Sequence, residues 1–167
     1  RETVLLDDTY IEVMLPLNAY SLRVIVPQGV KVVINGTEYL VSTSKGLELY
    51  LIEGMYNITV PKTVKYDMTR FLFTSWSDGV ITNSRVVILV RNETLSALYK
   101  VQYYLNVISP YGTIFGEGWY DKGSKARVYI KDTIVYMNPL MRFKFAGWEG
   151  DVKSGEPELT IIVDKPY

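Results

Sequence analysis

Short apolar segments whose side chains alternate with polar ones recur along the whole chain. In one of them, Leu22, Val24 and Val26 alternate with Arg23 and Ile25. Such alternation is typical of β-strands, and no window keeps the 3.6-residue period of a helix. β-Branched and aromatic residues dominate these segments, as they do on pleated surfaces. The pattern predicts an all-β protein, with two tandem small β-sandwich or β-grasp-like domains and little or no helix.

Turn signals separate the predicted strands. Asn35-Gly36 lies between two of them and is the strongest short signal for a β-hairpin. Glu53-Gly54 lies between the next two, and we expect a tight hairpin turn there as well. Further strands are expected at 71–76, 86–90 and 95–99.

An internal repeat determines the expected architecture. Residues 20–29 (YSLRVIVPQG) and 103–112 (YYLNVISPYG) are identical at six of ten positions, and 70–76 (RFLFTSW) and 142–148 (RFKFAGW) share Arg, both Phe and Trp. The two matches occur in the same order, which is the signature of a repeated structural unit. The interval between the landmarks is shorter in the second repeat, which fits one missing or shortened hairpin.

The repeat sets the expected domain boundaries. Residues 1–18 form an N-terminal strand segment, 19–101 a first β unit, and 102–167 a second β unit that lacks its last strand. The joint at 98–105 contains no Gly, Pro or Ser, so we expect one continuous extended segment rather than a flexible linker.

Composition removes several classes of function. The 167 residues include 18 basic and 18 acidic side chains, so no net positive field exists to bind nucleic acid. His and Cys are both absent, which removes the commonest general base, the thiol nucleophile and the best zinc ligands. No apolar run approaches the length of a membrane helix. We expect a non-enzyme without cofactor, metal or membrane span.

Two stretches resemble known surface modules. Residues 104–164 contain a Gly-rich turn, a Trp-Tyr-Asp-x-Gly step and Phe-x-Gly-Trp followed by Gly-Asp, and this stretch resembles the divergent InlB-type B-repeat. The front half of the first repeat, VPQGVKVVINGTEYLV, is similar to the PEGA module. The resemblance implies an extracellular or cell-surface location in an archaeal or bacterial S-layer, filament or adhesion protein, with no catalytic residues.

Aromatic residues lead into the same point of each repeat. Each Trp could stack on a sugar, but large aromatic side chains more often anchor the core of a small β domain. The predicted core anchors are Phe71, Phe73 and Trp76 in the first repeat and Phe143, Phe145 and Trp148 in the second.

Carboxylates close to glycines suggest two further kinds of site. Ser77-Asp78-Gly79 and Glu149-Gly150-Asp151 could hold calcium, although Asx turns explain an Asp beside Gly without a metal. Glu117 and Asp121, with Glu149 and Asp151, could serve glycoside hydrolysis, but solvated turn positions are the better interpretation. We therefore expect no metal-binding and no catalytic residues.

Three glycosylation sequons lie in the first repeat, at Asn35, Asn57 and Asn92. Asn35 also has a role in a turn, so its sequon has a second explanation. If the protein is secreted, these are the candidates for glycan attachment.

The second repeat ends before the counterpart of the 95–99 strand. We expect an unpaired edge beside Leu159, Ile161 and Val163, which invites strand addition. The N-terminal segment offers Ile11, Val13 and Leu15 after a one-residue slip, and 3–15 also resembles the closing hairpin of a preceding unit. Three explanations stay open: strand exchange with another molecule, a continuing array of units, and pairing within the chain.

The sequence leaves three functional hypotheses. The first is a structural or adhesive surface module that binds other copies of itself, or neighbouring β units of a longer surface protein, by stacking rigid units and possibly exchanging strands. The second is an accessory region of a secreted hydrolase. The third is a carbohydrate-binding module, with glycans as partners and Trp76 or Trp119 in a groove.

Overall fold

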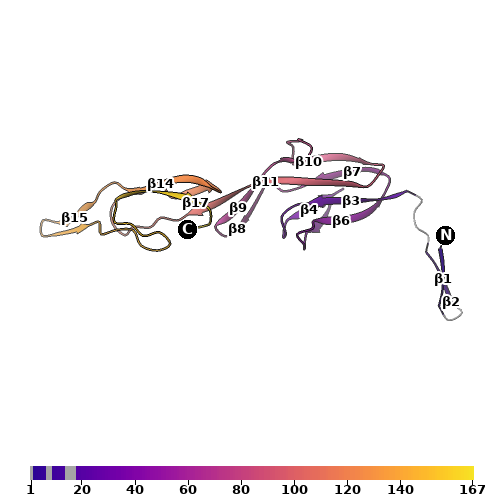
Figure 1. Cartoon of the computed structure of the whole chain (residues 1–167), viewed down its shortest axis with the longest axis horizontal. Coiled ribbons are helices and arrows are strands. Elements are labelled where there is room, and N and C mark those ends of the chain that lie inside the picture. The colour runs from indigo at the N-terminus through magenta and orange to yellow at the C-terminus, as the bar shows by residue number, and fades with distance from the viewer. Residues whose placement is uncertain (1, 7–8, 14–17) are drawn as a thin grey trace. The chain divides into compact units, whose positions relative to one another are not determined.

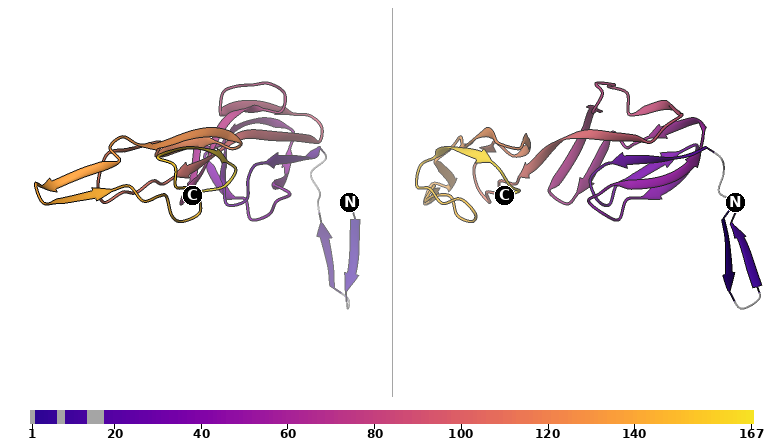
Figure 2. Two further views of the ribbon diagram at one scale, coloured as in Figure 1. Left: turned by 60° about the vertical axis from the view of Figure 1, so that its left-hand side comes forward. Right: turned by 45° about the vertical axis from the view of Figure 1, so that its right-hand side comes forward.

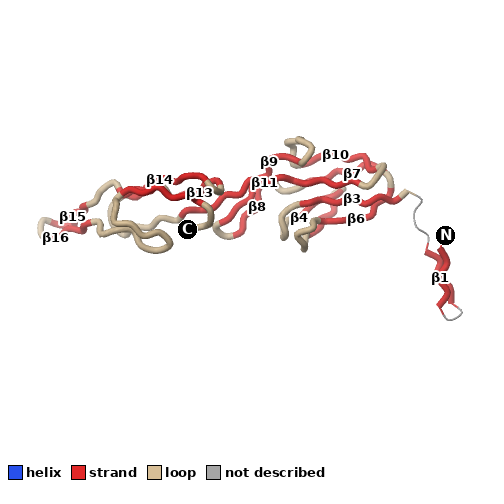
Figure 3. Tube along the Cα trace, in the orientation of Figure 1, coloured by secondary structure: helices blue, strands red, loops and turns tan. Residues whose placement is uncertain are grey.

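The computed structural model describes residues 2–6, 9–13 and 18–167. These residues form seventeen strands and no helix, so the predicted all-β fold is confirmed (Figure 3). The chain divides into two compact units. Unit 1 comprises Arg1–Lys62 and Phe73–Tyr99, and unit 2 comprises Thr63–Leu72 and Lys100–Tyr167.

Unit 1 contains two main sheets. One has the order β10-β7-β4-β5, and in the other β6, β3, β11 and β9 are neighbours in that order. The strands are β3 (Ala19–Ile25), β4 (Lys31–Ile34), β5 (Thr37–Leu40), β6 (Leu47–Ile52), β7 (Gly54–Thr59), β9 (Thr69–Trp76), β10 (Ser84–Leu89) and β11 (Glu93–Leu105). The first residues of β9 and the last residues of β11 belong to unit 2.

Unit 2 is built around a three-stranded sheet of order β12-β14-β17. The end of β11 pairs with β13, β8 pairs with the start of β9, and β15 and β16 form a separate hairpin. The strands are β8 (Thr63–Tyr66), β12 (Ile114–Phe115), β13 (Gly118–Asp121), β14 (Ser124–Ile130), β15 (Ile134–Asn138), β16 (Met141–Lys144) and β17 (Glu158–Val163).

The alternating sequence pattern places alternate side chains in the cores. In β3, Leu22 and Val24 are buried while Arg23 between them is exposed. In β14, Ala126 and Val128 are buried in the same way. The core of unit 2 consists of Leu105, Val107, Ala126, Val128, Ile161 and Val163.

One predicted hairpin turn is confirmed and the other is wrong. Asn35 and Gly36 have φ values of 48° and 85° and join β4 to β5 as a hairpin. Glu53, in contrast, lies between β6 and β7, which belong to different sheets. It is a corner at which the chain changes sheet, because β6 pairs with β3 while β7 pairs with β4 and β10.

The two repeats follow one strand plan. β6 pairs with β3 in the first repeat as β13 pairs with the end of β11 in the second, with Tyr20 opposite Leu51 and Tyr103 opposite Tyr120. β7 and β10 likewise correspond to β14 and β17, and the β8–β9 hairpin corresponds to β15–β16. Among the described residues, β5 and the first half of β11 have no counterpart strand in the second repeat. The absence of a β5 counterpart is the shortened hairpin that the sequence indicated.

The N-terminal segment forms a hairpin of its own. β1 (Glu2–Leu6) pairs antiparallel with β2 (Thr9–Val13), with Val4 opposite Ile11 (Figure 1). These two strands form a two-stranded sheet, separate from the sheets that contain β3 to β17. Leu15, the third proposed exchange residue, lies outside the described residues.

Candidate functional site

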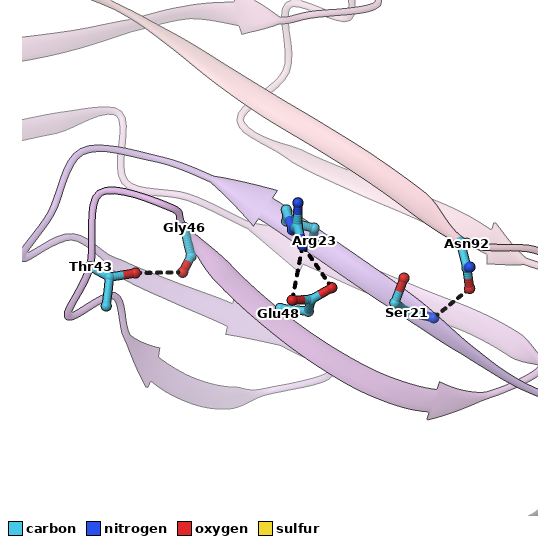
Figure 4. Close-up of polar contacts among 6 residues, drawn as sticks. All are labelled: Ser21, Arg23, Thr43, Gly46, Glu48 and Asn92. Carbon is cyan, nitrogen blue, oxygen red and sulfur yellow. Dashed lines mark hydrogen bonds and ion pairs between the residues drawn. The ribbon is translucent and has the colours of Figure 1, made fainter.

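The strand that completes unit 1 is the first half of β11. It runs parallel to β3, with Glu93 opposite Leu22 and Leu95 opposite Val24. Asn92 fixes its start, because the Asn92 side-chain oxygen accepts a hydrogen bond from Ser21 N–H at 2.9 Å (Figure 4).

Beside this contact, the Arg23 guanidinium of β3 donates to both carboxylate oxygens of Glu48 on β6 at 3.0 Å (Figure 4). β3 therefore lies between two partners: β11 on one side and β6 on the other.

The far side of β11 is also bonded. Ser77, the residue after Trp76, donates its N–H to Ser96 O at 2.8 Å, and the Ser77 hydroxyl accepts from Ser96 N–H at 3.3 Å. Leu95 and Ala97 point inward and are 6% and 8% exposed. The strand therefore contributes two apolar side chains to the core and fills the place between β3 and β9.

Unit 2 has a groove at the equivalent place. Its volume is about 290 Å³. One wall is formed by 105–108, which is the last residue of β11 and the three residues after it. The opposite wall is Trp148 with the loop 149–152. Val128 of β14, Leu159 and Ile161 of β17, and Tyr167 complete the lining. The second repeat thus leaves open the place that Leu95 and Ala97 fill in the first.

Tyr167 lies at one end of this groove. Tyr167 donates its N–H to Tyr104 O at 3.2 Å, and Tyr167 O accepts from Asn106 N–H at 3.0 Å. This pattern pairs Tyr167 with Leu105 in the parallel sense, as Glu93 pairs with Leu22 in the first repeat. The first step of the missing strand is therefore present, in the same direction and register.

Among the described residues, the 105–108 wall pairs with Tyr167 and with no further strand on this side. Within the described residues, neither Asn106 C=O nor Ile108 N–H has a backbone partner, although Ile25, the counterpart of Ile108, pairs with Ser96. The Ile108 side chain is 77% exposed. Unpaired backbone groups beside an apolar surface are the features that make an edge receptive to another strand.

The expectation about the location of the missing strand needs correction. β17 does lie at the edge of its sheet, but so does β10, its counterpart in the first repeat, although the first repeat has all its strands. The 93–97 segment pairs in the other sheet of unit 1, not beside β10. The open strand position therefore lies beside 105–108. Leu159 and Ile161 line the groove with their side chains, and Val163 is buried in the core.

The predicted core anchors differ in burial. Trp76 is 0% exposed and donates its Nε1–H to Thr82 O at 2.8 Å. Trp148 makes the equivalent bond to Glu156 O at 3.0 Å but is only half-buried. Trp148 lines the open groove, whereas β9, the strand of Trp76, is paired with β11. The four phenylalanines, Phe71, Phe73, Phe143 and Phe145, are also half-buried.

A second aromatic cluster within unit 2 surrounds Trp119. The Arg70 guanidinium lies 4.5 Å from the ring centroid, Lys65 Nζ lies 5.4 Å from it, and Tyr104 packs edge-on at 5.2 Å. Tyr104 N–H also donates to Met68 O at 2.9 Å. The β8–β9 hairpin therefore packs on β13 and the end of β11. No sequence signal indicated this contact, because the two segments are far apart along the chain.

Hydrogen bonds extend this cluster to a carboxylate. Arg70 Nε donates to Gln102 Oε1 at 2.6 Å, and Gln102 Nε2 donates to Asp121 Oδ1 at 2.7 Å. The Gln102 hydrogen bond and the Lys100 ammonium lower the pKa of Asp121 from its usual value. Cations cover the Trp119 ring, so it is poorly placed to stack on a sugar.

Most of the carboxylates singled out in the sequence pair with a cation. Asp78 bonds Arg85 at 2.7 Å, and this bond lowers the pKa of Asp78. Glu149 lies 3.4 Å from Lys153, and Asp151 lies 3.7 Å from Lys165. Glu117 differs, because it accepts from the Tyr104 hydroxyl at 2.9 Å. Within 2–6, 9–13 and 18–167, no three acidic side chains form a group that could hold a metal ion.

The three sequon asparagines are exposed at turns and strands of unit 1. The side-chain oxygen of each accepts a hydrogen bond. The Asn35 oxygen accepts from Asn57 N–H, and the Asn57 side-chain oxygen accepts from the Ser84 hydroxyl. The Asn92 oxygen accepts from Ser21 N–H. A glycan attaches through the amide nitrogen, which these bonds do not use.

Comparisons of the chain with family models, with curated proteins and with solved structures found no match. In the described part of the chain, no helix has the length and apolar character needed to span a membrane.

We expect Tyr99 to make the stability of unit 1 sensitive to alkaline pH. Its hydroxyl donates to Pro61 O at 2.8 Å, and burial raises its pKa to about 12. A tyrosine in the unfolded chain has a pKa near 10, so the unfolded state loses this proton first as the pH rises. We therefore expect stability to be intact below about pH 10 and to fall between about pH 10 and 12.

The measurement is the urea midpoint at about pH 9 and about pH 11, for the parent and for Tyr99→Phe. The Phe variant should lose less stability over this interval, because it has no proton to release. An equal loss in both proteins would contradict the assignment to Tyr99.

Proposed function

We propose that the protein is a non-catalytic structural or adhesive module of an extracellular surface protein. The observation that supports this most directly is the repeated strand plan. Two β units follow one pattern in a single chain, and β11 contributes its first half to unit 1 and its second half to unit 2. Tandem structural units in one chain commonly serve as scaffolds with extended binding surfaces.

The chemistry of the side chains agrees with a structural role. The chain has no His and no Cys. The charged groups around Trp119, Asp78 and Asp151 bind one another, as in the Arg70–Gln102–Asp121 chain of hydrogen bonds. Such networks fix the geometry of a surface rather than activate a nucleophile.

The sequons fit an extracellular location. Asn35, Asn57 and Asn92 are exposed with their side-chain oxygens already bonded, which holds each amide in a defined orientation. The resemblance of 104–164 to InlB-type B-repeats supports the same location.

A second candidate function is an accessory or carbohydrate-binding region of a secreted hydrolase. The half-buried Trp148 in the groove of unit 2 favours it, because an aromatic ring in a groove can stack on a sugar. The ring is held by its bond to Glu156 O and by edge-on packing against Phe145 at 5.4 Å.

Labelling of intact source cells tests the proposed location. An antibody against the purified chain should label unpermeabilised cells, and external protease should remove the signal. Label that requires permeabilisation would overturn the proposal. In parallel, a glycan array probed with the parent and with Trp148→Ala separates the second candidate, since sugar binding that depends on Trp148 would favour it.

A further inference from the structure

The open place in unit 2 defines what would fill it. The occupant must run parallel to 105–108, since Tyr167 and Leu105 already pair in that sense. It must place apolar side chains at alternate positions, as Leu95 and Ala97 do in the first repeat. It must also provide backbone hydrogen-bond partners for Asn106 C=O and Ile108 N–H.

The chain itself carries a segment of this kind. β2 reads Thr9-Tyr10-Ile11-Glu12-Val13, and the first half of β11 begins Glu93-Thr94-Leu95-Ser96-Ala97. Aligned in this way, the two segments place Ile11 at the position of Leu95 and Val13 at the position of Ala97. The two segments then lie at nearly the same distance along the chain before a Tyr that opens a unit. This residue is Tyr20 after β2 and Tyr103 after the first half of β11.

We propose that the groove of unit 2 binds residues 10–13 of β2 from a second molecule of this chain, next to Tyr167 and in the register of β11 on β3. Thr9 stays outside the groove, because Tyr167 holds the position that corresponds to Glu93. Glu12 would then lie opposite Ile108, as Ser96 lies opposite Ile25. This inference rests on the proposed structural function and names the partner and the site of assembly.

Strand exchange requires β2 to leave β1. The β1–β2 hairpin has five paired positions and forms a separate two-stranded sheet. An isolated two-stranded hairpin is marginally stable in water. In the groove, the same strand would pair with 105–108 and bury two apolar side chains against Trp148 and β17, which favours the exchange.

A second surface independently indicates the same partner. The β15–β16 hairpin, drawn in orange in Figure 2, is the counterpart of β8–β9. It carries exposed apolar side chains at and near its tip. Leu140 is 98% exposed and Tyr136 is 67% exposed. In the first repeat the equivalent tip is partly covered, because Met68 and Arg70 contact Tyr104 and Trp119. The second hairpin therefore lacks the surface on which the first one packs.

Unit 1 offers that surface. By register, Tyr50 on β6 is the counterpart of Trp119 on β13: Tyr50 lies opposite Ser21, and Trp119 lies opposite Tyr104. Tyr50 is 77% exposed. In a second molecule whose β2 fills the groove, Tyr50 would receive Arg142, the counterpart of Arg70. One arrangement therefore satisfies both the strand and the hairpin.

The donor strand and the acceptor groove are different parts of the chain, so this contact is heterologous. Each bound molecule presents its own groove and its own β15–β16 hairpin to the next molecule. Assembly is therefore head-to-tail, and it produces a filament unless the rotation between molecules closes a ring.

Cysteine cross-linking tests the register, because the natural chain contains no Cys. A tagged Glu12→Cys protein is mixed with an untagged Ile108→Cys protein under mild oxidation. Neighbouring strands lie about 4.8 Å apart, which suits a disulfide. We expect a mixed dimer, detected by its mass.

The matched control replaces Ile108→Cys by Ile162→Cys. Ile162 is 58% exposed on β17, the alternative edge, so it is also accessible to a thiol. Preferential cross-linking at 162 overturns the proposal in favour of edge addition. The proposal is also overturned if no 12–108 dimer forms at concentrations where the intact chain assembles. That result would not decide the proposed surface function, which cell labelling tests separately.

The hairpin contact has its own test. Leu140→Asp should weaken assembly of the intact chain at least about tenfold, measured by light scattering across a concentration series. The control is Ile81→Asp, at a side chain that is 79% exposed in a loop of unit 1. Circular dichroism verifies that both variants fold. Equal assembly of both variants would overturn the second half of the proposal.

Discussion

Trp76→Ala should cost about 3–5 kcal/mol of unfolding free energy, the usual range for removing a fully buried Trp. Trp76 is 0% exposed, packs edge-on against Phe73 at 5.9 Å and bonds Thr82 O. The change leaves a large cavity and an unpaired carbonyl. Urea unfolding followed by circular dichroism measures the loss.

Trp148→Ala is the matched comparison, because Trp148 occupies the same point of the second repeat. We expect a clearly smaller loss, since Trp148 is half-buried and lines an open groove. If Trp148→Ala destabilises the monomeric chain as strongly as Trp76→Ala, the groove is not an open part of unit 2.

Gly116→Ala should destabilise unit 2 by more than about 3 kcal/mol, because it combines backbone strain with a clash. Gly116 follows β12 and has a φ of 105°, in a region that L-residues rarely adopt. A Cβ at this position would meet Arg127 O and lie 2.8 Å from the Val128 Cα. Both are backbone atoms of β14 and cannot rotate away.

Gly123→Ala separates the effect of backbone strain from the effect of the steric clash. Gly123 also has a positive φ, 82°, but a Cβ there meets nothing within 4 Å. We expect a loss of about 1–2 kcal/mol, the cost of the left-handed conformation alone. Similar losses in both variants, measured by thermal unfolding, would show that the close approach of Gly116 to β14 contributes nothing.

The shortened loop around Gly116 shows what the sequence could and could not indicate. The repeat indicated that a hairpin is missing or shortened in the second repeat. The structure adds that this hairpin lacks the counterpart of β5. In place of that strand, Gly116 turns the chain close against β14. The sequence could not indicate this, because the close contact joins Gly116 to residues in another strand.

The site was predicted in part. Counting strands in the two repeats indicated no counterpart of 95–99 within residues 102–167. The sequence alone suggested β17 as the neighbour of that strand, because Leu159 to Val163 precede the end of the chain. In the structure the equivalent strand pairs in parallel with β3. Parallel partners need not be adjacent in sequence, so the order of strands in a sheet cannot be read from chain order.

The sequence by itself determined the all-β class, most strands of the first repeat, the repeat itself and the alternation that decides which side chains are buried. These follow from local geometry, since side chains alternate across a strand with a period of two. Only the tertiary structure decided which strands are neighbours, that Glu53 is a corner, that the β8–β9 hairpin packs on β13, and where unit 2 is open. Pairing between distant strands depends on the packing of whole faces, and no local pattern of residues specifies it.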